Sequence, residues 1–186
     1  MKLFLVLALV IQATIAFSAT PQDGGVYKIV PKGSGQVLGV SGNSNDVGAD
    51  IVGQPDQSSN YQRFILHQES PNVFFIEIAG NGLYVSNYVS PPRQANFNPD
   101  AFYQDYELIP AAGGYYMIRP VANQNNVLTI APGGGLSWQP KTGADNQLFF
   151  FCSSNVIPSN GTAGLKLAGL GAGVDNENYE GIDLRP

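Results

Sequence analysis

The chain has 186 residues and a net charge of −5, from 9 Lys and Arg against 14 Asp and Glu. An acidic chain with few, scattered basic residues is a poor partner for nucleic-acid phosphates and for anionic lipid. Its single cysteine, Cys152, rules out an intrachain disulfide, so one hydrophobic core must hold the fold. We expect Cys152 to be a buried small residue; an intermolecular disulfide is the alternative.

Residues 1–18 are typical of a secretory signal peptide. Lys2 supplies a short positive region, Leu3–Ile11 is apolar without interruption, and small residues around Ala16 and Ser18 offer cleavage positions. The apolar run is short for a membrane span of about 20 residues, and no later stretch is long and apolar enough. We therefore expect a secreted protein without membrane insertion.

The next part of the chain, residues 24–152, repeats one pattern three times. The strongest mark is a glutamine followed two residues later by an aromatic residue, and the glutamines are 42 and then 43 residues apart. The three copies are Gln62–Phe64, Gln104–Tyr106 and Gln147–Phe149. Two further marks keep the same order: Leu38–Val40, Leu83–Val85 and Leu128–Ile130, then Gly53–Pro55, Phe97–Pro99 and Trp138–Pro140. Repetition at this period predicts a fold built from three similar units.

Each unit contains four short segments typical of β-strands, separated by turns rich in Gly, Asn and Pro. Asn81-Gly82, for example, indicates a tight hairpin. No sustained helical period follows residue 18. The predicted strands are 26–30, 37–40, 50–54 and 63–67 in unit one, 73–78, 83–86, 94–97 and 105–109 in unit two, and 115–119, 127–130, 136–139 and 148–152 in unit three.

A unit of four strands cannot bury its apolar face alone, whereas three units can close around a shared axis. We therefore predict an all-β domain in which one aromatic residue of each unit points inward: Phe64, Tyr106 and Phe149. The preceding glutamines would use their side-chain amides to pair backbone groups of turns. Such a threefold mark has a structural role and does not by itself show binding.

This pattern resembles the ricin B-type lectins, and unit one is most similar to the fungal members. The third residue of the glutamine mark is usually Trp in that family, whereas this chain has Phe or Tyr. The resemblance covers about residues 24–151. It implies a β-trefoil with pseudo-threefold symmetry, made of a six-stranded barrel and three hairpins that cap one end. It also implies binding of a glycan or glycoprotein without catalysis and without a cofactor.

The resemblance further implies three positions for a sugar site, because a sugar ring needs an aromatic surface for its C–H face and fixed polar groups for its hydroxyls. The aspartate position holds Gly39, Tyr84 and Thr129, the asparagine position Tyr61, Tyr103 and Asn146, and the stacking position Gly53, Phe97 and Trp138. Unit three keeps more of the residue types that the family uses at these positions than units one and two do. The predicted carbohydrate-binding residues are therefore Thr129, Trp138, Asn146 and Gln147. Alternatively, Trp138 closes a gap in the barrel and Asn146 caps a turn.

Catalysis and metal binding have little support in the sequence. His67 is the only histidine, so no second imidazole could activate a nucleophile. The acidic residues show no spacing of a glycosidase pair or a calcium loop. We therefore predict that the protein is not an enzyme and that it has no metal site and no cofactor. The alternative function is protein recognition, such as that of a secreted protease inhibitor, through the loops at 41–49 and 87–92.

The last segment, residues 153–186, lies outside the repeat and is rich in Gly and Asn with an acidic end. We expect a tail, with one weak strand near 164–170. Asn160 begins the only glycosylation sequon.

The signal-peptide prediction can be tested on exported protein. Mass spectrometry of the secreted material should show a new N-terminus between Phe17 and Thr20, since peptidase removes the apolar segment. Secreted protein that retains Met1 would contradict the assignment.

Overall fold

A computed structural model describes residues 20–100 and 102–153 and shows an all-β domain. The strands are β1 (Val26–Pro31), β2 (Val37–Val40), β3 (Ile51–Gln54), β4 (Phe64–Ser70), β5 (Val73–Ile78), β6 (Tyr84–Ser86), β7 (Arg93–Ala95), β8 (Asp105–Pro110), β9 (Tyr116–Pro120), β10 (Asn126–Ile130), β11 (Leu136–Pro140) and β12 (Phe149–Ser153). Four 3-10 helices lie between them: η1 (Ser41–Asn43), η2 (Asn60–Gln62), η3 (Ala112–Gly114) and η4 (Asp145–Gln147). All twelve predicted strands are confirmed, with small shifts of their ends.

Several predictions concern residues outside the described ranges. These are the signal peptide at 1–18, the sequon at Asn160, the weak strand at 164–170 and the acidic tail. Within the described ranges, no helix has the length and apolar character needed to cross a membrane.

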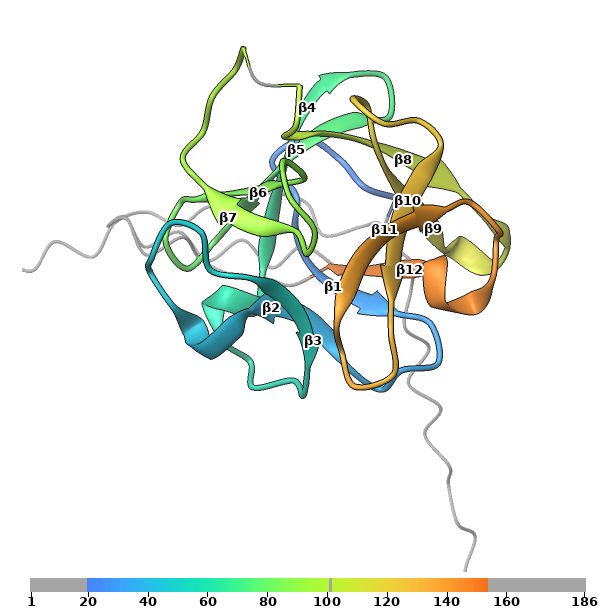
Figure 1. The fold of residues 1–186 in the computed structure, drawn as a ribbon, viewed down its shortest axis with the longest axis horizontal. Coiled ribbons are helices and arrows are strands. Elements are labelled where there is room, and N and C mark those ends of the chain that lie inside the picture. Colours follow the sequence, from blue (N-terminus) through green and yellow to red (C-terminus); the bar gives the residue numbers. More distant parts are fainter. Residues whose placement is uncertain (1–19, 101, 154–186) are drawn as a thin grey trace, which may run out of the picture. The chain divides into compact units, whose positions relative to one another are not determined.

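Six of the strands close into an antiparallel barrel (Figure 1). The hydrogen-bonded order is β4-β1-β12-β9-β8-β5, and β5 pairs back with β4. The other six strands form three hairpins, β2-β3, β6-β7 and β10-β11, which surround the barrel axis in Figure 1. This arrangement is a β-trefoil, as predicted. Closure leaves no free edge in the barrel, which a single four-stranded unit could not achieve.

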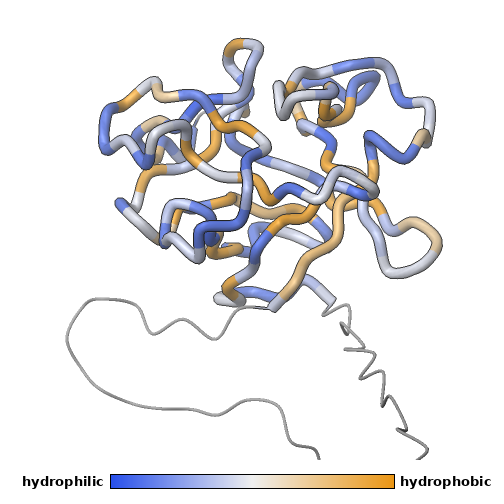
Figure 2. Tube along the Cα trace, turned by 90° about the horizontal axis from the view of Figure 1, so that it is seen from below, coloured by the Kyte–Doolittle hydropathy of each residue, from blue (hydrophilic) through white to orange (hydrophobic). Residues whose placement is uncertain are grey.

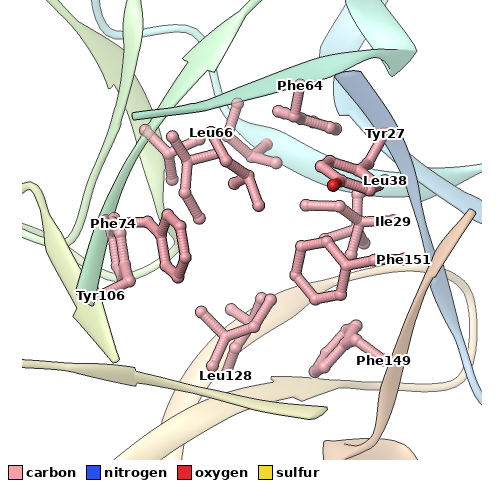
Figure 3. Close-up of a cluster of buried hydrophobic side chains, with 14 of the residues drawn as sticks. Tyr27, Ile29, Leu38, Phe64, Leu66, Phe74, Tyr106, Leu128, Phe149 and Phe151 are labelled. Atoms are coloured by element: carbon pink, nitrogen blue, oxygen red, sulfur yellow. The ribbon is translucent and has the colours of Figure 1, made fainter. Parts of the chain in front are cut away.

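The core fills the barrel because buried and half-buried residues alternate along its strands. β1 and β5 both show this alternation, and the tube in Figure 2 changes repeatedly between hydrophobic and hydrophilic positions. Phe64, Tyr106 and Phe149 are 1%, 0% and 0% exposed and project into the common core shown in Figure 3. Their predicted inward orientation is confirmed. Cys152 faces the other side of β12 and is a half-buried free thiol, so the expectation of full burial was wrong.

The predicted role of the three glutamines is also confirmed. The Gln62 amide accepts from the Gln57 N–H at 2.7 Å and donates to the Pro55 carbonyl at 2.7 Å. The Gln104 amide makes the equivalent bonds to the Asn98 N–H and the Asn96 carbonyl, both at 2.8 Å.

In unit three the Gln147 amide accepts from the Thr142 N–H at 2.7 Å and donates to the Pro140 carbonyl at 2.9 Å. All three glutamines are buried. Each one therefore pairs the backbone of the turn that leads from its hairpin into the barrel.

The strand register corrects the alignment of unit two. Leu38 pairs with Gly53, and Leu128 pairs with Trp138. The equivalent pair in unit two is Val85 with Gln94. Leu38, Val85 and Leu128 all line one small internal cavity, which supports this equivalence.

The glutamine bonds agree with that register. The carbonyls that the glutamines bind, at Pro55, Asn96 and Pro140, lie two residues after Gly53, Gln94 and Trp138. The sequence alignment of Leu83 and Phe97 with these positions was therefore wrong. Ser86, rather than Tyr84, occupies the aspartate position of unit two.

Truncating an inward aromatic residue should destabilise the barrel. We expect Phe149→Ala to lower the free energy of unfolding by about 3–5 kcal/mol, because it leaves a cavity in the closed core. The half-buried neighbour Phe150 faces outward, so Phe150→Ala should cost less than about 1.5 kcal/mol. Urea unfolding measures both, and equal losses would contradict the assigned register of β12.

Candidate functional site

Two of the predicted sugar-binding residues in unit three serve the fold. Thr129 is 9% exposed and Gln147 is 2% exposed. The Gln147 amide donates to the Thr129 hydroxyl at 3.1 Å, and this hydroxyl donates to the Val127 carbonyl at 3.3 Å. Their polar atoms are thus already paired inside the domain. Asn146, in η4, is exposed and is the only one of the four that reaches the surface fully.

Trp138 packs toward the barrel. Its ring stacks on Tyr106, with a centroid separation of 5.8 Å and an interplanar angle of 17°. The indole Nε1 is buried and has no hydrogen-bond partner among the described residues. Trp138 also lines the internal cavity between the hairpins and the barrel. Trp138 is half-buried. This packing matches the alternative, in which Trp138 fills a gap in the barrel, and its role as a sugar-stacking platform stays a prediction.

Aromatic residues gather instead on the outer surface of unit two. Phe97 follows β7, is 45% exposed, and stacks in a tilted arrangement on Tyr84 of β6 at 4.5 Å. Its ring also contacts Phe75 of β5 edge to face at 5.1 Å. The ring of His67, which belongs to β4 at the end of unit one, lies 5.8 Å from that of Tyr84. We call the surface formed by His67, Phe75, Glu77, Tyr84 and Phe97 the second-unit patch.

Glu77 is the polar centre of the second-unit patch. Its Oε2 lies 2.6 Å from the His67 Nε2, and it accepts the Tyr84 hydroxyl at 3.2 Å. Its Oε1 accepts no hydrogen bond from any described residue. Burial, and then the charge of Glu77, raise the pKa of Tyr84 to about 12. The Tyr84 hydroxyl therefore remains a donor at physiological pH.

This geometry follows from the pleat and the register. His67 and Phe75 are partners across β4 and β5, and Glu77 and Tyr84 are partners across β5 and β6. Outward positions of adjacent strands lie close enough for their side chains to touch. Glu77 and Tyr84 also flank the predicted Asn81-Gly82 hairpin, so their pairing could have been inferred from the sequence. The position of Phe97 could not, because the alignment assigned it to the position that Gln94 occupies.

Chemically, the second-unit patch combines an exposed aromatic ring with a carboxylate, an imidazole and a phenol. Such a set can hold a small polar ligand that has one apolar face. The five residues of the patch include no pair of carboxylates and no Ser, Thr or Cys nucleophile beside His67. In the ranges that the structure describes, no cluster of His, Cys, Asp and Glu could bind a metal ion.

Comparison with known proteins supports the β-trefoil fold. A family model described as a ricin-type beta-trefoil lectin domain-like region matches residues 14–96, which include unit one and part of unit two. No curated protein matches the chain. Among solved structures, the designed threefold-symmetric protein ThreeFoil is similar, with 18% identity, a TM-score of 0.65, and coverage of 70% of this chain and 99% of that one.

Two natural structures are similar to a comparable extent. The C-half of an earthworm R-type lectin, in complex with GalNAc, has 17% identity, a TM-score of 0.57, and coverage of 70% of this chain and 99% of that one. An exo-beta-1,3-galactanase from Clostridium thermocellum has 23% identity and a TM-score of 0.64 over 71% of this chain, which spans only 31% of the enzyme. Identities this low establish a shared fold and leave function to be argued from the site.

The packing of Trp138 predicts a role in stability. We expect Trp138→Ala to lower the free energy of unfolding by about 2–4 kcal/mol, because it removes the stacking on Tyr106 and enlarges the cavity beneath it. Trp138→Phe keeps an aromatic ring and removes the unpaired indole N–H, so it should cost less than about 1.5 kcal/mol. Chemical unfolding provides the measurement. An alanine variant as stable as the parent would mean that the indole faces solvent.

Proposed function

We propose that this chain is a secreted, non-catalytic carbohydrate-binding protein of the ricin B-type lectin kind, with its glycan site at the second-unit patch. The single observation that carries the proposal is that Tyr84 joins an exposed aromatic ring to a carboxylate: its ring packs on Phe97, and its hydroxyl donates to Glu77. The match to a lectin family model and the likeness to an R-type lectin that binds GalNAc support it. The similarity of unit one to fungal members is part of this proposal.

Phe97 would supply the stacking surface. Its ring is held by Tyr84 on one side and by the edge contact with Phe75, so it is fixed before a ligand arrives. A rigid ring loses little conformational entropy on binding. The C–H face of a pyranose can lie against such a ring, in the same way that aromatic side chains bind apolar faces elsewhere.

Glu77 would supply the polar contacts. Its Oε1 is open to accept a sugar hydroxyl, while the bonds of Oε2 to His67 and Tyr84 hold the carboxylate in place. A carboxylate fixed by two neighbours is an acceptor of defined direction, and a charge-assisted hydrogen bond is stronger than a neutral one. A neutral sugar fits best, since an acidic sugar would be repelled by Glu77.

The predicted site in unit three now has weaker support than the second-unit patch. Asn146 is exposed and could contact a ligand, but Thr129 and Gln147 are buried, and Trp138 stacks on Tyr106. Trp138 is half-buried and therefore offers a sugar less open ring surface than Phe97 does. We therefore propose unit three as a secondary contact at most.

Protein recognition is the second candidate, and one observation favours it. Apart from Val47, the exposed large hydrophobic residues among those described lie between positions 88 and 102: Tyr88, Val89, Phe97 and Phe102. Tyr88 is 76% exposed and belongs to the loop at 87–92 that the sequence singles out for such a role. These residues are close together in the sequence, and exposed apolar residues that form a contiguous patch commonly mark an interface. A protease-inhibition panel run beside a glycan array tests this alternative.

Truncation of Phe97 should abolish most of the glycan binding. We expect Phe97→Ala to lower the affinity for a neutral glycan about tenfold or more, because the stacking surface is lost. Stability should change by less than about 1 kcal/mol, since the ring is half exposed. Glu77→Gln keeps the shape and removes the charge, and it should weaken binding about fivefold or more. An array of neutral glycans, followed by calorimetry, gives both values.

Tyr88→Ala is the matched control, because it removes an exposed aromatic residue from the same unit but outside the patch. Its glycan affinity should equal that of the parent. Unchanged binding by a folded Phe97→Ala variant would place the site elsewhere. A parent protein that binds no glycan but inhibits a protease through Tyr88 would establish the second candidate.

A further inference from the structure

A separate pocket of about 430 Å³ lies where β12 runs between β1 and β9. Its lining includes Val30 and Pro31 of β1, Phe150 of β12, and Tyr115, just before β9. None of these residues belongs to the second-unit patch. The volume is within the range of about 300–1,000 Å³ that is typical of small-molecule sites.

Glycines leave part of the pocket wall without side chains. Gly33 and Gly35 in the turn after β1 have φ values of 70° and 67°, a region that favours glycine. A Cβ atom added at either position would contact nothing within 4 Å. At these two positions, therefore, open space and not another side chain adjoins the backbone of the turn.

Two aromatic residues and one cation line the pocket. Tyr115 and Phe150 meet edge to face with a centroid separation of 5.8 Å. The Lys32 Nζ lies 5.3 Å from the centroid of the Tyr115 ring. Lys32 is the only charged residue that lines the pocket. Its backbone N–H donates to the Leu148 carbonyl at 2.8 Å, which fixes the start of this side chain against the barrel.

The ammonium of Lys32 already forms an ion pair with the exposed carboxylate of Asp145. The Asp145 Oδ1 lies 2.7 Å from the Lys32 Nζ, and the side chains are 71% and 35% exposed, respectively. This hydrogen bond raises the pKa of Lys32, so the ammonium remains charged. Exposed ion pairs are weak, typically about 0–1 kcal/mol, and a ligand can compete with them. Asp145 therefore shows the kind of group that Lys32 can bind.

We propose that this pocket binds an acidic sugar, whose carboxylate pairs with Lys32 in place of Asp145 and whose C–H face packs on Tyr115 and Phe150. One carboxylate replaces another on the same ammonium, so the contact adds no unpaired buried charge. This inference rests on the proposed function, because it extends glycan binding to a second surface. The second-unit patch and this pocket carry charges of opposite sign. Glu77 repels an acidic sugar, whereas Lys32 attracts one.

The experiment is an NMR titration of the full chain at low ionic strength with glucuronate, and with glucose as the neutral counterpart. Glucuronate should shift the signals of residues around Lys32 and Tyr115 and bind at least about fivefold more tightly than glucose. Rising salt should weaken glucuronate binding, because the contact is between exposed charges. Lys32→Met keeps the apolar stem and should reduce the affinity for glucuronate by at least about fivefold.

Two further variants separate the acidic-sugar proposal from a neutral-sugar site. Asp145→Asn removes the competing charge, so it should strengthen glucuronate binding about twofold or more. If Asp145 instead helped to bind hydroxyl groups, the same change would weaken binding and overturn the proposal. Lys28→Met and Asp56→Asn are matched controls, since Lys28 and Asp56 form an ion pair of 2.6 Å that does not line the pocket. Both should leave glucuronate binding unchanged.

Other outcomes also decide the proposal. Equal binding of benzoate and glucuronate would overturn the sugar assignment, and no shift around Lys32 with glucuronate would overturn the site. Phe97→Ala should leave glucuronate binding intact, and Lys32→Met should leave binding of neutral glycans intact. A protein that binds neutral glycans but not glucuronate would thus reject this inference and keep the proposed function.

Discussion

Each unit of this fold depends on a buried glutamine amide that pairs the backbone of one turn. The turn leaves the hairpin and enters the barrel, so its peptide groups have no strand partner. Burying such groups unpaired costs about 1–3 kcal/mol each. Gln62, Gln104 and Gln147 offer a donor and an acceptor in one neutral side chain, which neither a carboxylate nor an ammonium can do. Because the amide holds the turn in place, the aromatic residue two positions later always enters the core.

The three units keep this interaction but differ where the hairpins meet the barrel. Gly53 approaches Gly134 so closely that its N–H donates to the Gly134 carbonyl at 2.7 Å, and a Cβ atom at either residue would clash. At the equivalent position, Gln94 donates to the carbonyls of Ser44 and Asp46 at 3.0 and 2.6 Å. Trp138 instead stacks on Tyr106. The equivalent position beside the barrel is thus filled by backbone in unit one, by the Gln94 amide in unit two and by the Trp138 indole in unit three. The repeat therefore does not produce three equal binding sites.

The sequence predicts the architecture better than it predicts the site. All twelve strands, the inward aromatic residues and the glutamine bonds follow from periodicity and from the need to pair buried backbone. The register of unit two could not be predicted from periodicity, because Leu83 and Phe97 reproduce the local pattern of the other units at shifted positions. Phe97 lies three residues after Gln94 and beyond the end of β7, so it does not take the position of Gly53 and Trp138 and is exposed instead. For the half-buried Trp138, the sequence pattern alone does not distinguish a stacking platform from a residue that packs on Tyr106.

The pairing of β1 with both β4 and β12 has a consequence for how the protein folds. Tyr27 is a register partner of Ser153, so the first strand completes its hydrogen bonding only with the last one. Contacts this distant along the chain make folding slow, because the entropy of a long loop is lost before the contact is gained. During synthesis one edge of β1 stays open until β12 has left the ribosome. The barrel therefore closes after translation of the domain is complete, and the open edge is the point at which the nascent chain is exposed to aggregation.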